Sequence, residues 1–398
     1  MTATELQAEL LRACHRDIAA LRMIVALAPI GGEGDKVAPP THKDGQYAFE
    51  TRTLNGRPSV STVLLDSVQS QANRCEEALL TSIRLGEVCL PLLEIRIPQH
   101  ETLTTLSVPH RIYDAIFRDS RYEGKRFRDS PLGQEIIAAR PWNATALYRF
   151  CPTALLFGSW DSQGGTGVMG ARFARALVSE IIGLDAVRGV RTSSRIDPLG
   201  IRALEGMVYR SATEQWTLDK SAAQKEKEKP LFYKTKGSPA EINHGNIPPT
   251  ITDPETGPGG VTFREARQTA VLSFAQLRKL YFPLDGTSDP EVDVAGRAVL
   301  AALGIYALTL QLRDGYQLRS RCQLIPVTTP SFEWLGATAD ERQVTSLSAE
   351  TARETLESLV DHASRRGLTW PTEPIQVEPE AKLIKLVQMS DAAEGAGE

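Results

Sequence analysis

A glycine-rich segment between residues 158 and 170 is the strongest candidate for chemistry in this sequence. Gly165, Gly167 and Gly170 have the G-x-G-x-x-G spacing with which a loop brings backbone N–H groups close to the pyrophosphate of a dinucleotide. In that motif the first glycine closely follows a strand, whereas seven residues separate Phe157 from Gly165 here. The segment therefore predicts a more general phosphate cradle, made by a glycine loop at the N-terminus of a helix.

Two predicted helices carry polar faces that suit a nucleic-acid backbone. Arg172 and Arg175 lie opposite an apolar stripe on the helix expected over residues 170–182, although solvated surface arginines are the simpler interpretation. On the helix expected over residues 67–84, one face is rich in hydrogen-bond donors without charge partners: Ser70, Gln71, Asn73 and Arg74. Both faces are candidates for phosphate or sugar contacts.

A third polar segment runs from Arg191 to Gly200, where Arg195 follows two serines at the end of a predicted strand. Arginine beside hydroxyl groups suits phosphate and sugar contacts, whereas Asp197, which precedes a proline, is expected to shape the turn. The next region, residues 220–260, combines six lysines between Lys220 and Lys236 with proline and glycine. It predicts either an arm that a partner orders or a disordered surface loop.

The elements that must position these residues form a mixed pattern of strands and helices. A buried strand over residues 59–66 leads directly into the helix over residues 67–84, and a strand over residues 153–160 precedes the glycine loop. Further predicted helices lie over residues 1–27, 112–118, 263–281, 292–312 and 349–366. Further predicted strands lie over residues 47–54, 89–97 and 187–193, with a closing strand over residues 382–389. Two strand-to-helix units separated by long insertions predict an α+β or split β-α-β sheet.

Composition argues against several other classes of protein. The 398 residues carry a net charge of -4, which does not suit a protein that coats nucleic acid through overall charge. Five cysteines lie far apart without metal-ligand spacing, so we expect reduced thiols, no metal site and no cofactor. No signal peptide is visible and no run approaches the ~20 apolar residues that span a bilayer, so we expect a cytoplasmic protein without membrane contact.

Five stretches, taken together and in order, resemble one known family. They are L-L-D-S-V-Q-S-Q-A-N-R (Leu64 to Arg74), H-R-I-Y-D-A-I-F-R-D-S (His110 to Ser120), L-L-F-G-S-W-D-S-Q-G-G (Leu155 to Gly165), S-S-R-I-D-P-L-G (Ser193 to Gly200) and H-G-N-I-P-P (His244 to Pro249). The set resembles the backbone subunit of type I-G (formerly I-U) CRISPR complexes. That subunit is the seventh Cas protein of the surveillance complex Cascade and belongs to the RAMP superfamily.

The resemblance implies an α+β fold with an RRM-like (ferredoxin-like) palm, large helical insertions and an extended arm or thumb. It divides the chain into an N-terminal helix and linker (1–45), the palm with its insertions (46–219), the arm (220–262), a helical segment with the closing strand of the palm (263–390) and a disordered tail (391–398). The chain lacks an RNP motif with stacking aromatic residues, which favours a protein that grips the backbone of any guide sequence.

The implied function is non-catalytic binding of guide RNA (crRNA) by a homo-oligomeric filament that presents the guide to target DNA in antiviral defence. The implied partners are crRNA, target DNA, further copies of the chain, a large PAM-recognising Cascade subunit, a fused guide-end-binding and guide-processing subunit, and a recruited helicase-nuclease. The expected RNA contacts are Ser70, Gln71, Asn73, Arg74, His110, Arg111, Trp160, Ser162, Gln163, Gly164, Gly165, Arg172, Arg175, Ser193, Ser194, Arg195, Lys234, Lys236, His244 and Asn246.

Two enzymatic alternatives remain open from the sequence. A nucleotide-dependent enzyme would use the loop from Gly164 to Gly170. An RNA-cleaving protein would need a general base, for which His110, His244 or the loop residue Asp161 are available. Asp161 is more simply explained as a residue that caps the loop.

Overall fold

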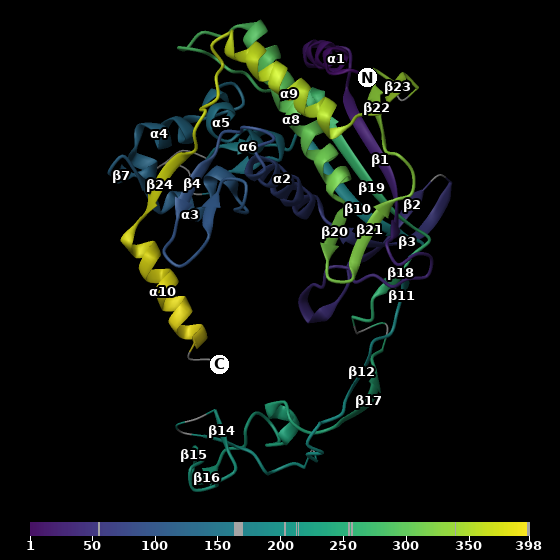
Figure 1. Cartoon of the computed structure of the whole chain (residues 1–398), viewed down its shortest axis with the longest axis vertical. Helices are drawn as coiled ribbons and strands as arrows, with labels where there is room; N and C mark the ends of the chain where they lie inside the picture. The colour runs from purple at the N-terminus through teal and green to yellow at the C-terminus, as the bar shows by residue number, and fades with distance from the viewer. Residues whose placement is uncertain are drawn as a thin grey trace. The chain divides into compact units, whose positions relative to one another are not determined.

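The computed structural model describes residues 1–54, 56–162, 170–202, 204–211, 213, 215–253, 255, 258–338 and 340–395. The chain divides into two compact units (Figure 1). Unit 1 contains residues 1–35, 49–186 and 263–389, and unit 2 contains residues 36–48, 187–262 and 390–398.

The main sheet of unit 1 is antiparallel and has the strand order of an RRM-like palm. Its path is β2-β3-β10-β19-β1-β21-β20, and β22 also pairs with β1 and with β23. The strands are β1 (Ala20–Pro29), β2 (Phe49–Leu54), β3 (Arg57–Asp66), β10 (Leu177–Leu184), β19 (Glu265–Ser273), β20 (Tyr316–Arg319), β21 (Cys322–Pro326), β22 (Ser331–Leu335) and β23 (Arg342–Thr345).

The central order β10-β19-β1-β21 is the 2-3-1-4 order of a ferredoxin-like β-α-β-β-α-β unit, with a long helix in each crossover. The crossover helices are α2 (Val68–Arg84), between β1 and β10, and α8 (Pro290–Asp314), between β19 and β21. The β2–β3 hairpin is inserted after β1 and extends the sheet beyond β10. The predicted α+β class with a ferredoxin-like palm is therefore confirmed.

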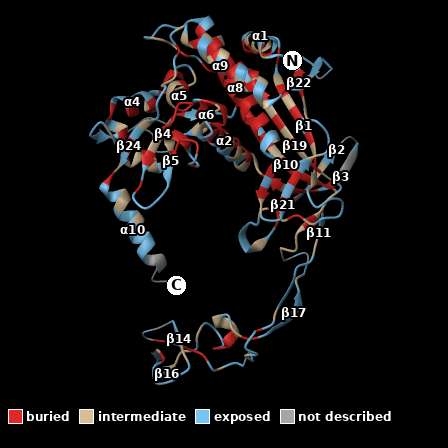
Figure 2. Cartoon of the chain, in the orientation of Figure 1, coloured by how far each residue is buried: buried red, intermediate tan, exposed pale blue. Residues whose placement is uncertain are grey.

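Helices pack together over this palm. In addition to the crossover helices they are α1 (Ala3–His15), α7 (Phe274–Leu277) and α9 (Ala349–Ser364). Helix α8 contacts α1, α2 and α9, and it is buried on nearly every side (Figure 2). By length and composition α8 could cross a membrane, contrary to the prediction that no run is apolar enough. Burial covers 94% of its most apolar stretch, as in the core helix of a soluble protein.

A second sheet of unit 1 has the order β5-β4-β24-β6-β7, with β4 and β24 parallel. Its strands are β4 (Leu93–Arg96), β5 (Thr102–Thr104), β6 (Ser120–Tyr122), β7 (Lys125–Arg126) and β24 (Ile375–Pro379). Short helices accompany it: η2 (Arg111–Tyr113), α3 (Ala115–Arg118), η3 (Phe127–Asp129), α4 (Pro131–Ala138), α5 (Thr145–Phe150) and α6 (Pro152–Leu156). A two-stranded hairpin of β8 (Ser159–Trp160) and β9 (Arg172–Phe173) follows α6.

Unit 2 consists of short antiparallel pairs with mostly exposed side chains (Figure 2). The pairs are β11 (Val187–Arg188) with β18 (Val261–Thr262), β12 (Thr192–Arg195) with β17 (Ile247–Ile251), β13 (Tyr209–Arg210) with β14 (Trp216–Thr217), and β15 (Lys225–Glu226) with β16 (Lys229–Pro230). Two short helical turns, η1 (Lys43–Gly45) and η4 (Pro239–Ile242), complete it. The unit starts before the arm predicted at residue 220 and includes part of the predicted linker.

Three predicted helices contain strands of the palm, because their apolar residues alternate with period two over those stretches. The predicted helix over residues 1–27 ends at His15, since Leu21, Met23, Val25 and Leu27 point inward from strand β1. The helix predicted over residues 170–182 contains most of strand β10, and the helix predicted over residues 263–281 contains strand β19. Strand β1, over residues 20–29, belongs to the palm although it lies in the predicted N-terminal region. The predicted strand over residues 153–160 is mostly helix α6.

The predicted closing strand over residues 382–389 is also wrong, because helix α10 spans Ala381–Gly395. The chain carries Lys382, Lys385 and Gln388 at helical spacing there, which a period-two interpretation overlooked. The fourth strand of the ferredoxin-like unit is instead β21, which pairs with β1 and β20.

Candidate nucleic-acid interface

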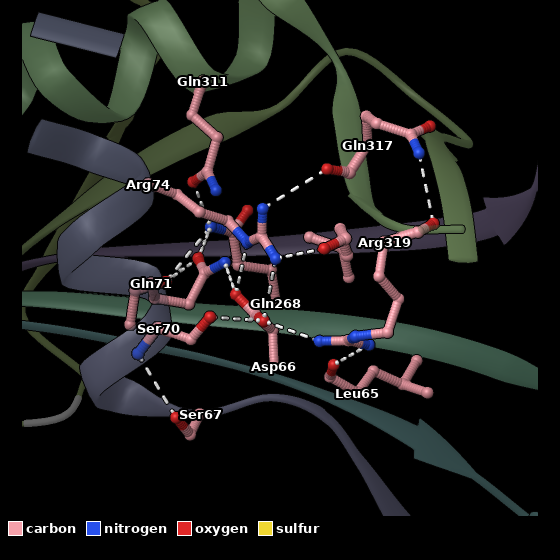
Figure 3. A network of polar contacts seen from close by, with 12 residues as sticks. Leu65, Asp66, Ser67, Ser70, Gln71, Arg74, Gln268, Gln311, Gln317 and Arg319 are labelled. Carbon is pink, nitrogen blue, oxygen red and sulfur yellow. Dashed lines mark hydrogen bonds and ion pairs between the residues drawn. The ribbon is translucent and has the colours of Figure 1, made fainter. Parts of the chain in front are cut away.

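The polar face predicted on α2 surrounds a buried carboxylate. Asp66 ends β3 and has no solvent exposure, and Ser67 caps the N-terminus of α2. Within the first two turns of α2, Asp66 accepts hydrogen bonds from Ser70 Oγ at 2.8 Å, Gln71 Nε2 at 2.7 Å and Arg74 Nε at 2.8 Å (Figure 3). These donors therefore satisfy an internal charge, as a buried carboxylate requires.

Arg319 at the end of β20 completes this cluster. Its Nη2 lies 3.1 Å from Asp66 Oδ1, and its Nη1 donates to the carbonyl of Leu65 at 2.8 Å. Arg74 reaches the same strand by donating to the carbonyls of Gln317, at 3.3 Å, and Leu318. Two arginines and one carboxylate thus join α2 to an edge of the palm (Figure 3).

Gln71 continues the network into the core. It is fully buried, and its Oε1 accepts hydrogen bonds from Ser179 Oγ and Gln268 Nε2, each at 2.9 Å. Its amide has no exposed atom with which to reach RNA. Asn73 is exposed on the same helix, so of the four residues predicted there it is the one whose side chain faces solvent freely.

The side chain of Arg111 is buried inside unit 1, and its backbone lies in a turn with a strained conformation. Its φ is +54°, and its side chain is 8% exposed. Both Nε and Nη2 lie 2.7 Å from the carboxylate of Glu76 on α2, and Nη1 donates to the carbonyl of Gly158 at 3.1 Å. Burial raises the pKa of Glu76 to about 7, and the guanidinium of Arg111 opposes this rise. The pair anchors the start of the glycine segment, while the neighbouring His110 is exposed.

The β8–β9 hairpin carries two predicted residues, Trp160 and Arg172, on its exposed face. Trp160 and Arg172 are directly paired across it, and the indole is 63% exposed. Their neighbours in the pairing, Ser159 and Phe173, alternate inward, and Phe173 is buried. Arg175 is exposed just beyond the hairpin. An aromatic face beside two arginines is suited to stack on bases and attract phosphates.

Residues Gln163, Gly164 and Gly165 lie outside the described part of the chain, whereas Ser162 is exposed at its edge. On the far side of that gap the chain continues as strand β9, so the helix on which a dinucleotide-type cradle depends is replaced by a strand. This corrects the prediction of a phosphate-binding helix N-terminus. Arg172 and Arg175 accordingly lie on a hairpin and its continuation, and not on a helix.

Asp161 holds the hairpin in place. It is 3% exposed, and its two carboxylate oxygens accept from Nη1 and Nη2 of Arg128 at 3.1 and 2.8 Å. Its backbone N–H donates to the carbonyl of Ala171 at 2.9 Å. A bidentate pair of this kind gives Asp161 a positioning role. The loop-capping explanation therefore fits its surroundings.

In unit 2, two segments far apart in sequence meet at Asp197. The buried carboxylate accepts from the backbone N–H groups of Leu199 at 2.8 Å and Gly245 at 2.6 Å, and these bonds, with that of Gly245 first, lower its pKa. Asn246 Oδ1 accepts from the Asp197 backbone N–H at 2.7 Å. Arg195 Nη2 and His244 Nδ1 lie 3.6 and 3.9 Å from the same carboxylate. Asp197 shapes the turn, as predicted from Pro198.

The other predicted contacts of unit 2 lie on its surface. Ser193 and Ser194 are exposed on β12, and Ser193 Oγ lies 2.8 Å from Thr250 Oγ1 of β17. Lys234 lies with its Nζ 5.7 Å from the centre of the Tyr233 ring, and Lys236 pairs with Glu205 at 2.7 Å. These side chains are accessible to a polyanion, and RNA contact at each of them stays a prediction.

Sequence reasoning missed the partners of the predicted residues. Gln268, Glu76 and Arg128 each hold one of them, and each is remote from its partner in the chain. Only Glu76 offered a signal, because it places a carboxylate on the apolar face of α2 beside Cys75 and Leu79.

Part of the chain is similar to a known protein family. Residues 21–188 match the family model described as CRISPR-associated protein GSU0053, and no curated protein matches the chain. The matched segment runs from β1 to β11, so it includes α2, Arg111 and the β8–β9 hairpin, but it covers less than half of the chain. Over this segment the chain is similar to a CRISPR-associated (Cas) protein family.

Proposed function

We propose that this chain is the non-catalytic, crRNA-binding backbone subunit of a type I-G Cascade. Several copies would line one guide RNA in the cytoplasm and present it to target DNA. The observation that carries the proposal is the exposed pairing of Trp160 with Arg172 on the β8–β9 hairpin, beside Arg175. The Cas family match supports a role in CRISPR defence, and the RRM-like palm is a frequent platform for RNA.

The proposed partners follow from the same assignment. They are crRNA, target DNA, further copies of the chain, the large PAM-recognising subunit, the fused guide-end-binding and guide-processing subunit, and the recruited helicase-nuclease. Contacts that ignore base identity suit such a subunit, since arginines, serines and an indole face bind the backbone or stack on any base.

The structure also changes which residues are useful probes of RNA binding. Arg74 and Gln71 belong to the network around Asp66, so their substitution would disturb folding and RNA binding together. Trp160 and Arg172 are exposed, and the hairpin does not need their side chains for its backbone pairing. The double substitution Trp160→Ala with Arg172→Ala therefore tests binding more cleanly.

We expect this double variant to bind single-stranded RNA at least about tenfold more weakly than the parent, since one stacking contact alone is worth about 1–3 kcal/mol. The loss of one phosphate contact also flattens the dependence of log affinity on log salt by about 0.7. Fluorescence anisotropy with labelled RNA at several salt concentrations measures both. Trp142→Ala with Arg84→Ala removes the same side-chain types from other exposed positions and is the control. Equal affinities for both double variants would refute the proposed role of the hairpin.

A further inference from the structure

A cavity of about 350 Å³ lies between α2, α8 and β20, apart from the β8–β9 hairpin. This volume is in the range of small-molecule sites. Residues of three elements line it, among them Arg74, Glu77, Ala78, Gln311, Asp314 and Tyr316. All of them belong to unit 1.

The hydrogen-bond network fixes the orientation of the amide at the base of this cavity. A carboxylate only accepts hydrogen bonds, so Asp66 requires the Nε2 of Gln71 to face it, at 2.7 Å, and leaves Gln71 Oε1 directed toward Gln268. Gln268 must then donate through Nε2, both to Gln71 Oε1 and to Gln311 Oε1, each at 2.9 Å. Gln311 is therefore oriented with its oxygen toward the network (Figure 3).

The Nε2 group of Gln311 therefore donates no hydrogen bond within the network. Gln311 is 5% exposed, it lines the cavity, and its Nε2 has no hydrogen-bond partner among the described residues. A buried amide N–H without an acceptor destabilises the fold, because it has lost its hydrogen bonds to water. An acceptor atom supplied by a ligand in the cavity would remove this penalty.

The rim of the cavity carries hydrogen-bond acceptors, whereas its base carries the free donor of Gln311. Glu77 and Asp314 are exposed carboxylates, and within the described part of the chain Glu77 forms no ion pair, while Asp314 accepts from Arg313 Nε at 2.8 Å. The buried ring of Tyr316 and the small side chain of Ala78 add apolar surface, and the Tyr316 hydroxyl donates to Gln268 Oε1 at 2.5 Å. A fitting ligand has an acceptor edge, a donor edge and a flat apolar body.

We propose that this cavity between α2, α8 and β20 binds a guanine base, with an acceptor of the base on Gln311 Nε2 and its N1–H and N2–H groups on Glu77 or Asp314. Guanine combines O6 and N7 acceptors with three N–H donors, and N1–H and N2–H together match one carboxylate. Adenine and cytosine offer only two N–H donors, both on a single exocyclic amine. The carboxylates disfavour a phosphate at the rim, so the base and not the phosphate is what the cavity selects.

Ligand-observed NMR titration of the full chain with guanosine, inosine and adenosine tests the proposal. Inosine lacks the 2-amino group, so we expect guanosine to bind about tenfold or more tightly than inosine and adenosine. Gln311→Met should weaken guanosine and inosine binding alike, because both nucleosides share the acceptor atoms. Glu77→Gln with Asp314→Asn should abolish the preference for guanosine over inosine, whereas the exposed control Glu373→Gln should keep it. An unchanged preference in the Glu77 and Asp314 variant would overturn the proposal. The Glu77 and Asp314 variant alters only exposed side chains, so the proposal can still be tested if Gln311→Met fails to fold.

The base has two possible sources, a free nucleoside or a nucleotide within a bound strand. Anisotropy with RNA oligomers that differ by one guanine-to-inosine replacement distinguishes them: preference in the oligomers alone assigns the site to a strand, and preference for guanosine alone assigns it to a free ligand. Absence of a guanine preference in both series refutes the site. Because guanosine binding needs no guide RNA, it can persist when the hairpin variants lose no RNA affinity, so the two proposals fail separately.

Discussion

At the scale of single residues, polar side chains that resemble surface contacts in the sequence prove to be internal. Ser70, Gln71 and Arg74 surround Asp66, and Arg111 neutralises Glu76 inside unit 1. A buried carboxylate is tolerated only when donors or cations satisfy it, and both carboxylates here have them. These residues therefore make the strongest stability predictions.

Breaking the pair of Arg111 and Glu76 should destabilise the fold strongly. We expect Arg111→Met to lower the free energy of unfolding by about 3–5 kcal/mol, because it leaves a buried carboxylate without its cation. The double variant Arg111→Met with Glu76→Gln should recover part of this loss. Urea denaturation measures both changes. The control Arg353→Met breaks only the partly exposed pair with Glu357, so it should lower the free energy of unfolding by less than about 0.5 kcal/mol. A loss below 1 kcal/mol for Arg111→Met would contradict a structural role.

The raised pKa of Glu76 predicts a pH dependence of stability. Since its pKa rises from 4.5 to about 7 on folding, the folded state binds more protons than the unfolded state between these values. The contribution of this group is fully present below pH 4.5 and is lost as pH rises toward 7, with a slope of at most about 1.4 kcal/mol per pH unit. Denaturation of the parent and of Glu76→Gln between pH 5 and 8 should show this slope only in the parent. A parent curve parallel to that of the variant would show that Glu76 stays ionised throughout.

At the scale of elements, the hairpin that presents Trp160 depends on one close approach. A Cβ added to Gly170 would lie 1.8 Å from the carbonyl oxygen of Asp161, so the backbone there admits only glycine. We expect Gly170→Ala to separate β8 from β9 and to weaken RNA binding about as much as the loss of Trp160 and Arg172. Gly86→Ala, at a position with φ +72° and no neighbour within 4 Å, is the control for backbone strain alone. RNA affinity that is unchanged in Gly170→Ala would contradict this dependence.

Elements with strong local signals could be predicted from the sequence. The strand and helix that meet at Asp66 lie within a residue or two of their expected limits, because a buried strand leads directly to the Ser67 cap. Strands β1, β10 and β19 were mistaken for helices, since in each some of the outward positions carry small or apolar residues, such as Ala26, Val178 and Val271. Their strand identity is set by pairing with partners far along the chain.

At the scale of the whole molecule, the predicted class of fold is confirmed while the candidate site is only partly recovered. The residue types around the glycine segment indicated a polyanion site, and the structure keeps Trp160, Arg172 and Arg175 on the surface. The contacts of Asp66 with Arg319 and of Arg128 with Asp161 could not be foreseen, because each joins elements that only the tertiary fold brings together. For the same reason the sequence did not indicate the cavity at Gln311.

The central claim is that several copies of the chain bind one guide RNA, and nuclease protection tests it most directly. The chain is expressed with a guide RNA and the proposed partner subunits, purified, digested with ribonuclease, and the protected RNA is sequenced. We predict protected RNA of defined length that high salt releases and that is lost in the Trp160→Ala, Arg172→Ala variant but retained in Trp142→Ala, Arg84→Ala. A protein that purifies as a monomer free of RNA, or protection that is equal in all variants, would contradict the account.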